Sequence, residues 1–115
     1  WLALTDANET NGCPWVIPEI HRLGTLKHET TDLGFEISLS DRDAIPLPLE
    51  AGSIAVFSSL TPHRTGPNTS QEIRKTYILQ YAPDGAQRKI SGSLSEPDDD
   101  GLRQYYVVKN GLILS

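Results

Sequence analysis

The sequence predicts an all-β protein, built as a sandwich or jelly roll of short strands. No segment keeps the 3.6-residue apolar period that is typical of an amphipathic helix. Short apolar runs are instead separated by clusters of Pro, Gly, Asn and Asp, a pattern that indicates strands joined by turns. Near the carboxyl end, Asn110-Gly111 stands between two apolar runs, and this dipeptide is the strongest short signal for a β-hairpin. We therefore also expect a terminal hairpin.

Two short strands are expected in the first quarter of the chain. Trp1–Thr5 is an apolar run of strand length, and it stops at the polar stretch Asp6–Gly12, whose Asn and Asp residues are typical of turns. Trp15–Ile17 is the second apolar run, and Pro18 closes it. The segment Glu19–Gly24 is too short and too interrupted for a helix of normal length, so we expect a turn there.

The clearest strand pattern lies in the middle of the chain. Apolar and polar residues alternate over Leu33–Leu39, which predicts a strand with one buried face. The run Ile45–Leu49 alternates in the same way, but Pro46 and Pro48 lack the N–H groups that a central strand donates. We therefore expect this run to be an edge strand or an irregular element, followed by a tight turn at residues 50–52.

Two further strands are expected around a loop. Ser53–Ser59 is a compact apolar run, and Ile73–Tyr81 is rich in β-forming residues. Between them, Thr61–Ser70 is dense in Pro, Gly, Asn and Thr, which predicts a loop. The sequence then turns polar and acidic over Ala82–Gly101, and this composition predicts an exposed linker.

Composition and charge argue against several function classes. The chain has 115 residues, a formal net charge of -5 and a pI near 5.0, so it offers no basic face to nucleic acid or to an anionic membrane. Its longest apolar runs are far shorter than the roughly 20 residues that span a bilayer. Cys13, the single cysteine, cannot form an internal disulfide or a zinc ribbon, and it fits a reducing cytosol. We therefore expect a cytoplasmic protein.

His63, Thr65 and Arg74 form the best candidate site. Because the segment between His63 and Arg74 joins two expected strands, both side chains are expected in the same barrel interior. Thr65 lies on the same side as His63 if the backbone is extended there. Imidazole binds first-row metals, and a guanidinium with a neighbouring hydroxyl binds a carboxylate through charge-assisted hydrogen bonds. The other two histidines, His21 and His28, have no neighbours that point to metal binding.

A plainer interpretation of these residues stays open at this point. His63 would then cap a loop, and Arg74 would pair with a surface acid such as Glu72 or Asp84. Spacing alone does not favour the metal site over this interpretation.

Several motifs stand in a fixed order over the first 82 residues, about 70% of the chain. They are a Trp-x-Ala-Leu strand, an Asn-Gly turn, a Val-Ile-Pro run with a following His and Gly, a strand that begins at a Gly, and a distal histidine and arginine block. The corresponding residues are Trp1–Asp6, Asn11–Cys13, Val16–Pro18 with His21 and Gly24, Ala51–Phe57, Pro62–Ser70 and Ile73–Arg74. Together they resemble the phytanoyl-CoA dioxygenase family.

The resemblance implies a fold and an activity. The fold would be the carboxyl-terminal half of a double-stranded β-helix, a cupin-like jelly roll, over residues 1–85, followed by a polar linker and the hairpin over residues 86–115. The activity would be that of an oxidoreductase, a non-haem dioxygenase that uses Fe(II) and the co-substrate 2-oxoglutarate to hydroxylate a small organic substrate.

The resemblance also implies roles for four residues. His63 would be the distal iron ligand, and Arg74 would bind the far carboxylate of 2-oxoglutarate. Thr65 would support Arg74, and Trp1 would lie beside the co-substrate pocket. No residue of the chain is assigned a catalytic role.

Two of the three iron ligands that the resemblance implies have no counterpart in the sequence. Enzymes of this kind hold iron with two histidines and one carboxylate, and the resemblance places the first histidine and the carboxylate in an upstream His-x-Asp motif. None of His21, His28 and His63 is followed two positions later by Asp or Glu. We expect the chain to be inactive alone, either because it is cut from a longer protein, as its start at Trp1 suggests, or because a partner chain completes the site.

Other functions stay open. The parent protein would be a halogenase if a small residue replaced the upstream carboxylate. A different class is a non-catalytic jelly-roll module that keeps His63 and Arg74 for its scaffold, or to hold a carboxylate ligand without metal. A third is a folding fragment whose open strand edges drive formation of a homo-oligomer. Acyl-CoA, amino acid and natural-product substrates are all compatible with the sequence.

Overall fold

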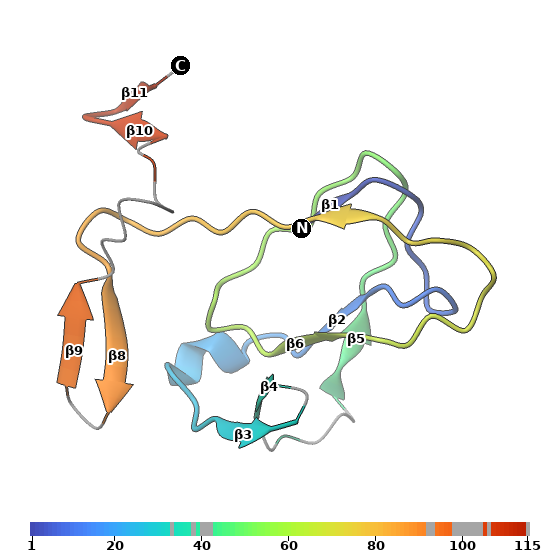
Figure 1. The fold of residues 1–115 in the computed structure, drawn as a ribbon, viewed down its shortest axis with the longest axis horizontal. Helices are drawn as coiled ribbons and strands as arrows, with labels where there is room; N and C mark the ends of the chain where they lie inside the picture. Colours follow the sequence, from blue (N-terminus) through green and yellow to red (C-terminus); the bar gives the residue numbers. More distant parts are fainter. Residues whose placement is uncertain are drawn as a thin grey trace. The chain divides into compact units, whose positions relative to one another are not determined.

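The regular structure of the chain is almost entirely β (Figure 1). The computed structural model describes residues 1–32, 34–37, 39, 43–91, 94–97, 105 and 107–114. In this part of the chain there are short strands and short 3₁₀ segments but no α-helix, which confirms the prediction of an all-β protein. The jelly-roll arrangement itself stays a prediction. None of the described helical segments has the length and apolarity that crossing a membrane requires.

The chain divides into two compact units, Trp1–Leu79 and Gln80–Ser115. The candidate site residues all belong to the first unit. The first unit contains two small sheets, a 3₁₀ turn and a hairpin, and the second contains two hairpins.

One sheet pairs the start of the first unit with its end. Strand β1 (Leu2–Ala3) runs antiparallel to β7 (Thr76–Tyr77). On the other side of β1, Trp1 exchanges two backbone hydrogen bonds with Ala55, at 3.0 and 2.9 Å, and an isolated bridge follows at Ile54. β1 therefore has a neighbouring segment on each side, one from the middle of the unit and one from its end. It lies within Trp1–Thr5, so part of the strand expected there is confirmed.

The other sheet has the strand order β5-β2-β6, with both pairings antiparallel (Figure 1). Strand β2 (Pro14–Val16) is central, between β5 (Ile45–Pro46) and β6 (His63–Thr65). The proline-containing run thus occupies an edge, as predicted. The tight turn after it is also confirmed, since the N–H of Ser53 donates to the carbonyl of Glu50 at 3.0 Å.

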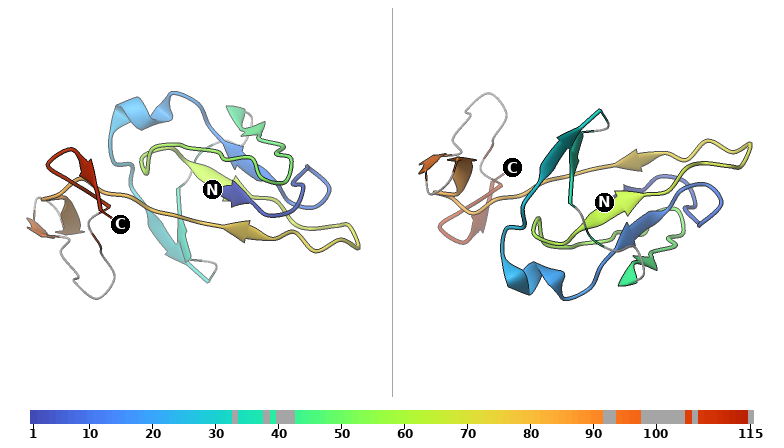
Figure 2. Two further views of the ribbon diagram at one scale, coloured as in Figure 1. Left: turned by 90° about the horizontal axis from the view of Figure 1, so that it is seen from above. Right: turned by 90° about the horizontal axis from the view of Figure 1, so that it is seen from below.

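A turn and a hairpin stand between β2 and β5 in the sequence. The predicted turn is a single 3₁₀ turn, η1 (Ile20–Leu23), and Figure 2 shows it leading into a hairpin of β3 (Glu29–Thr31) and β4 (Gly34–Glu36). Strand β4 confirms part of the predicted strand in this region. Residues 33 and 38 of that prediction lie outside the described residues.

The described part of the second unit forms two antiparallel hairpins. Strand β8 (Gln87–Ser91) pairs with β9 (Leu94–Pro97), and β10 (Val108–Lys109) pairs with β11 (Leu112–Ile113). Both residues of Asn110-Gly111 have positive φ, 52° and 78°. This is the requirement of a two-residue type I′ turn, so the terminal hairpin is confirmed.

Two predictions for the middle of the chain are wrong in part. Ser53–Ser59 is not a continuous strand, because its partner β1 is so short that pairing is limited to the bridge at Ile54 and the hydrogen bonds beside it. Thr61–Ser70 is not entirely a loop, because it contains β6. Pro62 and Pro67 flank this strand rather than interrupt it, so they do not remove any of its N–H groups.

The expected linker at Ala82–Gly101 is also wrong, since it contains the hairpin of β8 and β9. Its strands are polar, which made the sequence resemble a solvated loop. Opposite charges stabilise pairs of this kind, and Arg88 donates a hydrogen bond to Glu96 directly across the hairpin. The acidic run at residues 98–100 lies outside the described residues.

The buried apolar residues show where the interior of the first unit lies. Among the described residues, the apolar side chains exposed by less than a tenth are Ala3, Ala7, Cys13, Pro14, Val16 and Ile17. They belong to β1, to β2 and to the chain beside them. The interior therefore lies beside the candidate site residues, because β2 pairs with the strand that carries His63 and Thr65, and β1 directly follows Trp1.

Candidate functional site

The register of β2 and β6 decides which face carries His63 and Thr65. Val16 lies opposite His63, and Pro14 lies opposite Thr65. Directly opposed residues of antiparallel strands share a face, and both Val16 and Pro14 are buried. His63 and Thr65 therefore project from the sheet face that carries the buried residues, while they remain exposed themselves. The extended backbone that was expected at Thr65 is present.

Two contacts hold the ring of His63. Its Nδ1 lies 2.9 Å from the carbonyl oxygen of Thr61. A carbonyl oxygen only accepts hydrogen bonds, so Nδ1 is the donor in this contact, and in the neutral ring Nε2 then keeps the lone pair. The Phe57 ring packs against the imidazole, with the centroids 4.8 Å apart and the planes inclined by 52°. Metal-binding histidines show this same division between a donating and a ligating nitrogen.

Arg74 lies just before β7 and is half-buried. Its guanidinium carbon is 5.6 Å from the centroid of the Trp1 ring, within the range of a cation–π contact. Its Nε is buried and has no hydrogen-bond partner among the described residues. Within the same part of the chain Arg74 forms no ion pair with Glu72. A buried N–H group without a partner costs free energy, and a carboxylate is the acceptor that a guanidinium binds best.

Three contacts and one step along the chain, from Ala55 to Phe57, connect Arg74 to His63. Arg74 lies over Trp1, and Trp1 pairs with Ala55 through two backbone hydrogen bonds. Exposure alternates along the segment that contains Ala55, so Ala55 and Phe57 share its less exposed face. Phe57 in turn contacts His63. Three residues that the sequence predicted for the site are thus joined through two that it did not.

Thr65 is the predicted residue that the structure does not join to Arg74. No hydrogen bond connects the two side chains among the described residues. The link between them is indirect, because Thr65 pairs with Pro14 and the neighbouring Cys13 lies within the electrostatic influence of Arg74. The support of a carboxylate by Thr65 stays a prediction.

The thiol of Cys13 lies in the interior between these residues. It is fully buried, and burial raises its pKa above the usual range, although a backbone hydrogen bond with Leu47 and the positive charge of Arg74 oppose part of this effect. The neutral thiol is therefore the form that the folded state favours. Cys13 is a small apolar residue of the interior rather than a reactive group.

This burial leads to a prediction on pH. Because the folded pKa of Cys13 is raised, its contribution to the free energy of unfolding is present below about pH 8.5, the ordinary pKa of a cysteine. It is lost as the pH rises from there through the raised pKa. Urea unfolding midpoints between pH 7 and pH 10 check this, with Cys13→Ala as the variant in which nothing titrates at this position. An equal loss in both proteins would contradict the prediction.

A pocket of about 650 Å³ opens beside His63. It is lined by β2, by the segment that ends in β6 and by the region of the β3–β4 hairpin. Apolar side chains such as Trp15, Ile17 and Leu60 form part of its wall, and Glu36 is among its charged groups. The volume lies in the range of small-molecule sites, roughly 300 to 1,000 Å³. A small organic molecule would therefore fit next to the imidazole.

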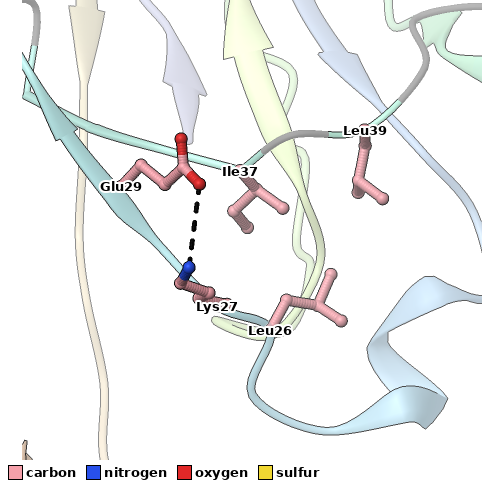
Figure 3. A pocket seen from close by; sticks show the side chains of 5 residues that line it. All are labelled: Leu26, Lys27, Glu29, Ile37 and Leu39. Carbon is pink, nitrogen blue, oxygen red and sulfur yellow. Dashed lines mark ion pairs between the residues drawn. The ribbon is translucent and has the colours of Figure 1, made fainter.

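A second, smaller pocket of about 190 Å³ lies against β3 (Figure 3). Leu26, Ile37 and Leu39 line it, together with Lys27 and Glu29, which form an ion pair at 3.9 Å. Both charged side chains are largely exposed, and such surface pairs contribute little to stability. Its single carboxylate, Glu29, is paired with Lys27, and no group of three possible metal ligands occurs among the described residues, so this pocket is not a second candidate site.

Sequence reasoning missed Phe57 and Thr61. Thr61 acts through its backbone carbonyl, which no side-chain pattern reveals. Phe57 was assigned only to an apolar run. Its position at the end of an alternating segment that leads to His63 is the signal that could have identified it.

The described residues do not by themselves complete a metal centre. Among the described residues, no group of three or more His, Cys, Asp or Glu side chains is placed to hold a metal ion. His63 is suited to be one ligand, because its Nδ1 is engaged by Thr61 and its Nε2 is left for a metal. Arg74 is suited to bind a carboxylate, because its buried Nε has no hydrogen-bond partner among the described residues. The arrangement therefore resembles one side of a metal and carboxylate site.

Comparison with known proteins identifies relatives of the first unit. Methylphosphonate hydroxylase of Gimesia maris is 35% identical over 83 residues, which cover 70% of this chain and 31% of that protein. Phytanoyl-CoA dioxygenase domain-containing protein 1 of Danio rerio is 31% identical over 89 residues, covering 69% and 31%. Phytanoyl-CoA dioxygenase 1 of Oryza sativa subsp. japonica is 33% identical over 85 residues, covering 69% and 30%.

The chain thus spans about a third of the length of these relatives. No solved structure gives a significant match. The model of one protein family, described as phytanoyl-CoA dioxygenase (PhyH), matches residues 1–76. This range includes Trp1, His63, Thr65 and Arg74, and it agrees with the resemblance noted from the motifs. The chain belongs to the phytanoyl-CoA dioxygenase family.

Proposed function

We propose that this chain forms the co-substrate side of a non-haem dioxygenase that depends on Fe(II) and 2-oxoglutarate. In this proposal His63 is one iron ligand, and Arg74 binds the far carboxylate of 2-oxoglutarate. The observation that carries the proposal is the buried, unpartnered Nε of Arg74, held over Trp1 and connected through Phe57 to His63.

Arg74 would bind the carboxylate and fix its orientation. A guanidinium presents its N–H groups in a rigid fork that matches the two oxygens of a carboxylate. Trp1 covers one side of this fork, and it thereby limits the directions from which water and ligand approach. A buried donor that lacks a partner in the free protein gains one when the co-substrate binds, and this difference favours binding.

The imidazole ring of His63 would be held in a fixed orientation for binding a metal. The hydrogen bond to the carbonyl of Thr61 fixes the tautomer, and Phe57 restricts rotation of the ring. When bound, Fe(II) with 2-oxoglutarate would supply the activation of dioxygen that hydroxylation of an unreactive C–H bond needs. The remaining ligands would come from the rest of the protein or from a partner chain.

The substrate would be a small organic molecule in the pocket of about 650 Å³ beside His63. Names of the relatives include a methylphosphonate hydroxylase and a phytanoyl-CoA dioxygenase, so family membership leaves a wide choice of substrate. The pocket supports the proposal through its volume and its position.

A titration of the full-length protein that contains this chain tests the proposal. Fe(II) and then 2-oxoglutarate are added without oxygen, and the visible charge-transfer band of their chelate is followed. We expect the band to form in the wild type. His63→Ala should weaken Fe(II) binding by at least about tenfold, because changes even in the shell around a metal ligand have effects of this size.

His21→Ala is the matched control, because His21 is exposed and belongs to η1. We expect this variant to give the same band as the wild type. A full-length protein that forms no band would overturn the proposal of an oxygenase. Binding of 2-oxoglutarate without any effect of Fe(II) would instead support the non-catalytic module.

A further inference from the structure

The hydroxyl of Thr5 makes two hydrogen bonds on either side of Arg74. Its Oγ1 accepts a hydrogen bond from the backbone N–H of Lys75 at 2.9 Å. The same Oγ1 donates toward the carbonyl oxygen of Ile73 at 3.4 Å. One side chain thus contacts the residue before Arg74 and the residue after it.

The hydrogen bonds of Thr5 continue the pairing of β1 and β7 at the point where their backbone hydrogen bonds end. Strands β1 and β7 pair at Ala3 and Thr76, and the N–H of Leu4 then donates to the carbonyl of Lys75 at 3.0 Å. If this register continued, Thr5 would lie opposite Arg74. The side chain of Thr5 supplies both a donor and an acceptor at this point, so it holds the backbone around Arg74 just before β7 begins.

The position of Arg74 is sensitive to this support. Its guanidinium lies 5.6 Å from the Trp1 ring, and its Nε is buried without a partner among the described residues. Within the described part of the chain, no hydrogen bond to Nε holds the guanidinium in place. The orientation of the guanidinium therefore depends on the backbone from which it projects.

We propose that Thr5 is a positioning residue that holds the backbone of Arg74 so that its guanidinium points at the carboxylate of 2-oxoglutarate. The inference rests on the proposed function, because it assumes that Arg74 binds this carboxylate. It adds a residue that acts through Arg74 and does not itself touch the co-substrate or the metal.

Two substitutions at one position test the inference in the full-length protein. Thr5→Val keeps the branched shape and removes both hydrogen bonds, whereas Thr5→Ser keeps the hydroxyl. Dissociation constants for 2-oxoglutarate are measured by calorimetry with Mn(II) in place of iron, and the affinity for Mn(II) is measured separately. We expect Thr5→Val to weaken 2-oxoglutarate binding about tenfold, because small misplacements of a binding group are costly. Thr5→Ser should restore most of the affinity, and Mn(II) affinity should not change.

Thr69→Val is the matched control. The hydroxyl of Thr69 donates to the carbonyl of Thr10 at 2.9 Å, so the same chemical change removes a similar hydrogen bond away from Arg74. We expect it to leave both affinities unchanged. A Thr5→Val protein that melts like the wild type and binds 2-oxoglutarate equally well would overturn the inference.

Arg74→Ala separates this inference from the proposed function. If it abolishes 2-oxoglutarate binding while Thr5→Val has no effect, the proposed function stands and the role of Thr5 is wrong. If Arg74→Ala itself leaves the affinity unchanged, the proposed function fails, and the role of Thr5 fails with it.

Discussion

Replacing Arg74 by alanine is expected to weaken binding of 2-oxoglutarate to the full-length protein by about 25-fold or more. Loss of one partner of a buried, hydrogen-bonded charge pair costs about 2 to 5 kcal/mol, and each 1.4 kcal/mol corresponds to about a factor of ten. The pair is expected to be this strong because Nε of Arg74 is buried and lacks any partner among the described residues. Calorimetric titration with 2-oxoglutarate in the presence of Mn(II) measures the change.

Two further variants define the cause of this loss. Arg74→Lys should recover only part of the affinity, because an ammonium group is a point charge without the planar fork of a guanidinium. Arg22→Ala should bind like the wild type, because Arg22 is an exposed arginine whose ion pair with Glu19 is 4.0 Å long. If Arg74→Ala bound 2-oxoglutarate normally, the carboxylate would have to bind elsewhere.

Gly12→Ala is expected to destabilise the chain by about 3 kcal/mol, the sum of backbone strain and overpacking. Gly12 has a φ of +86°, and a Cβ at this position would lie 2.5 Å from the carbonyl oxygen of Gly66. Both the conformation and the close approach therefore require a glycine. The contact holds the chain next to Cys13 against the chain next to Thr65. Urea unfolding, followed by tryptophan fluorescence, measures the loss.

Gly52→Ala separates the two causes. Gly52 has nearly the same φ, +89°, but no heavy atom lies within 4 Å of the position of its Cβ. We expect this substitution to cost only the strain of the left-handed conformation, about 1 to 2 kcal/mol. Equal losses for the two variants would show that the contact with Gly66 does not contribute.

Local signals in the sequence predicted the elements that depend on local conformation. The dipeptide Asn110-Gly111 indicated a hairpin because both residues accept positive φ, and both have it. Pro46 placed its run at a sheet edge because it has no N–H to donate. The strands at Leu2–Ala3 and Pro14–Val16 were found because they lie within short apolar runs.

Elements that depend on a partner far away in the sequence were missed. Strand β6 is stabilised by pairing with β2. The Pro and Gly residues that flank it are typical of loops, so the sequence predicted a loop there. Strands β8 and β9 are polar, and the charge pair between Arg88 and Glu96 becomes visible only when their register is known.

The candidate site shows the same limit. Its residue types suggested the chemistry of His63 and Arg74, and the spacing suggested that they share an interior. The supporting residues Phe57 and Thr5 were not predicted, because they act through contacts that only the fold creates. The hydrogen bond from Lys75 to Thr5 joins residues 70 positions apart.

This long separation has a consequence for folding. Pairings between distant residues form slowly, because the entropy of closing the loop is lost before their contacts are gained. During synthesis at about 5 to 20 residues per second, β1 emerges roughly 4 to 15 seconds before β7 is complete. Over that time the edge of β1 that later pairs with β7 is open to competing strands. The partnership of Trp1 with Arg74 is thus expected to form last in the first unit, after the sheet around β2 has its strands.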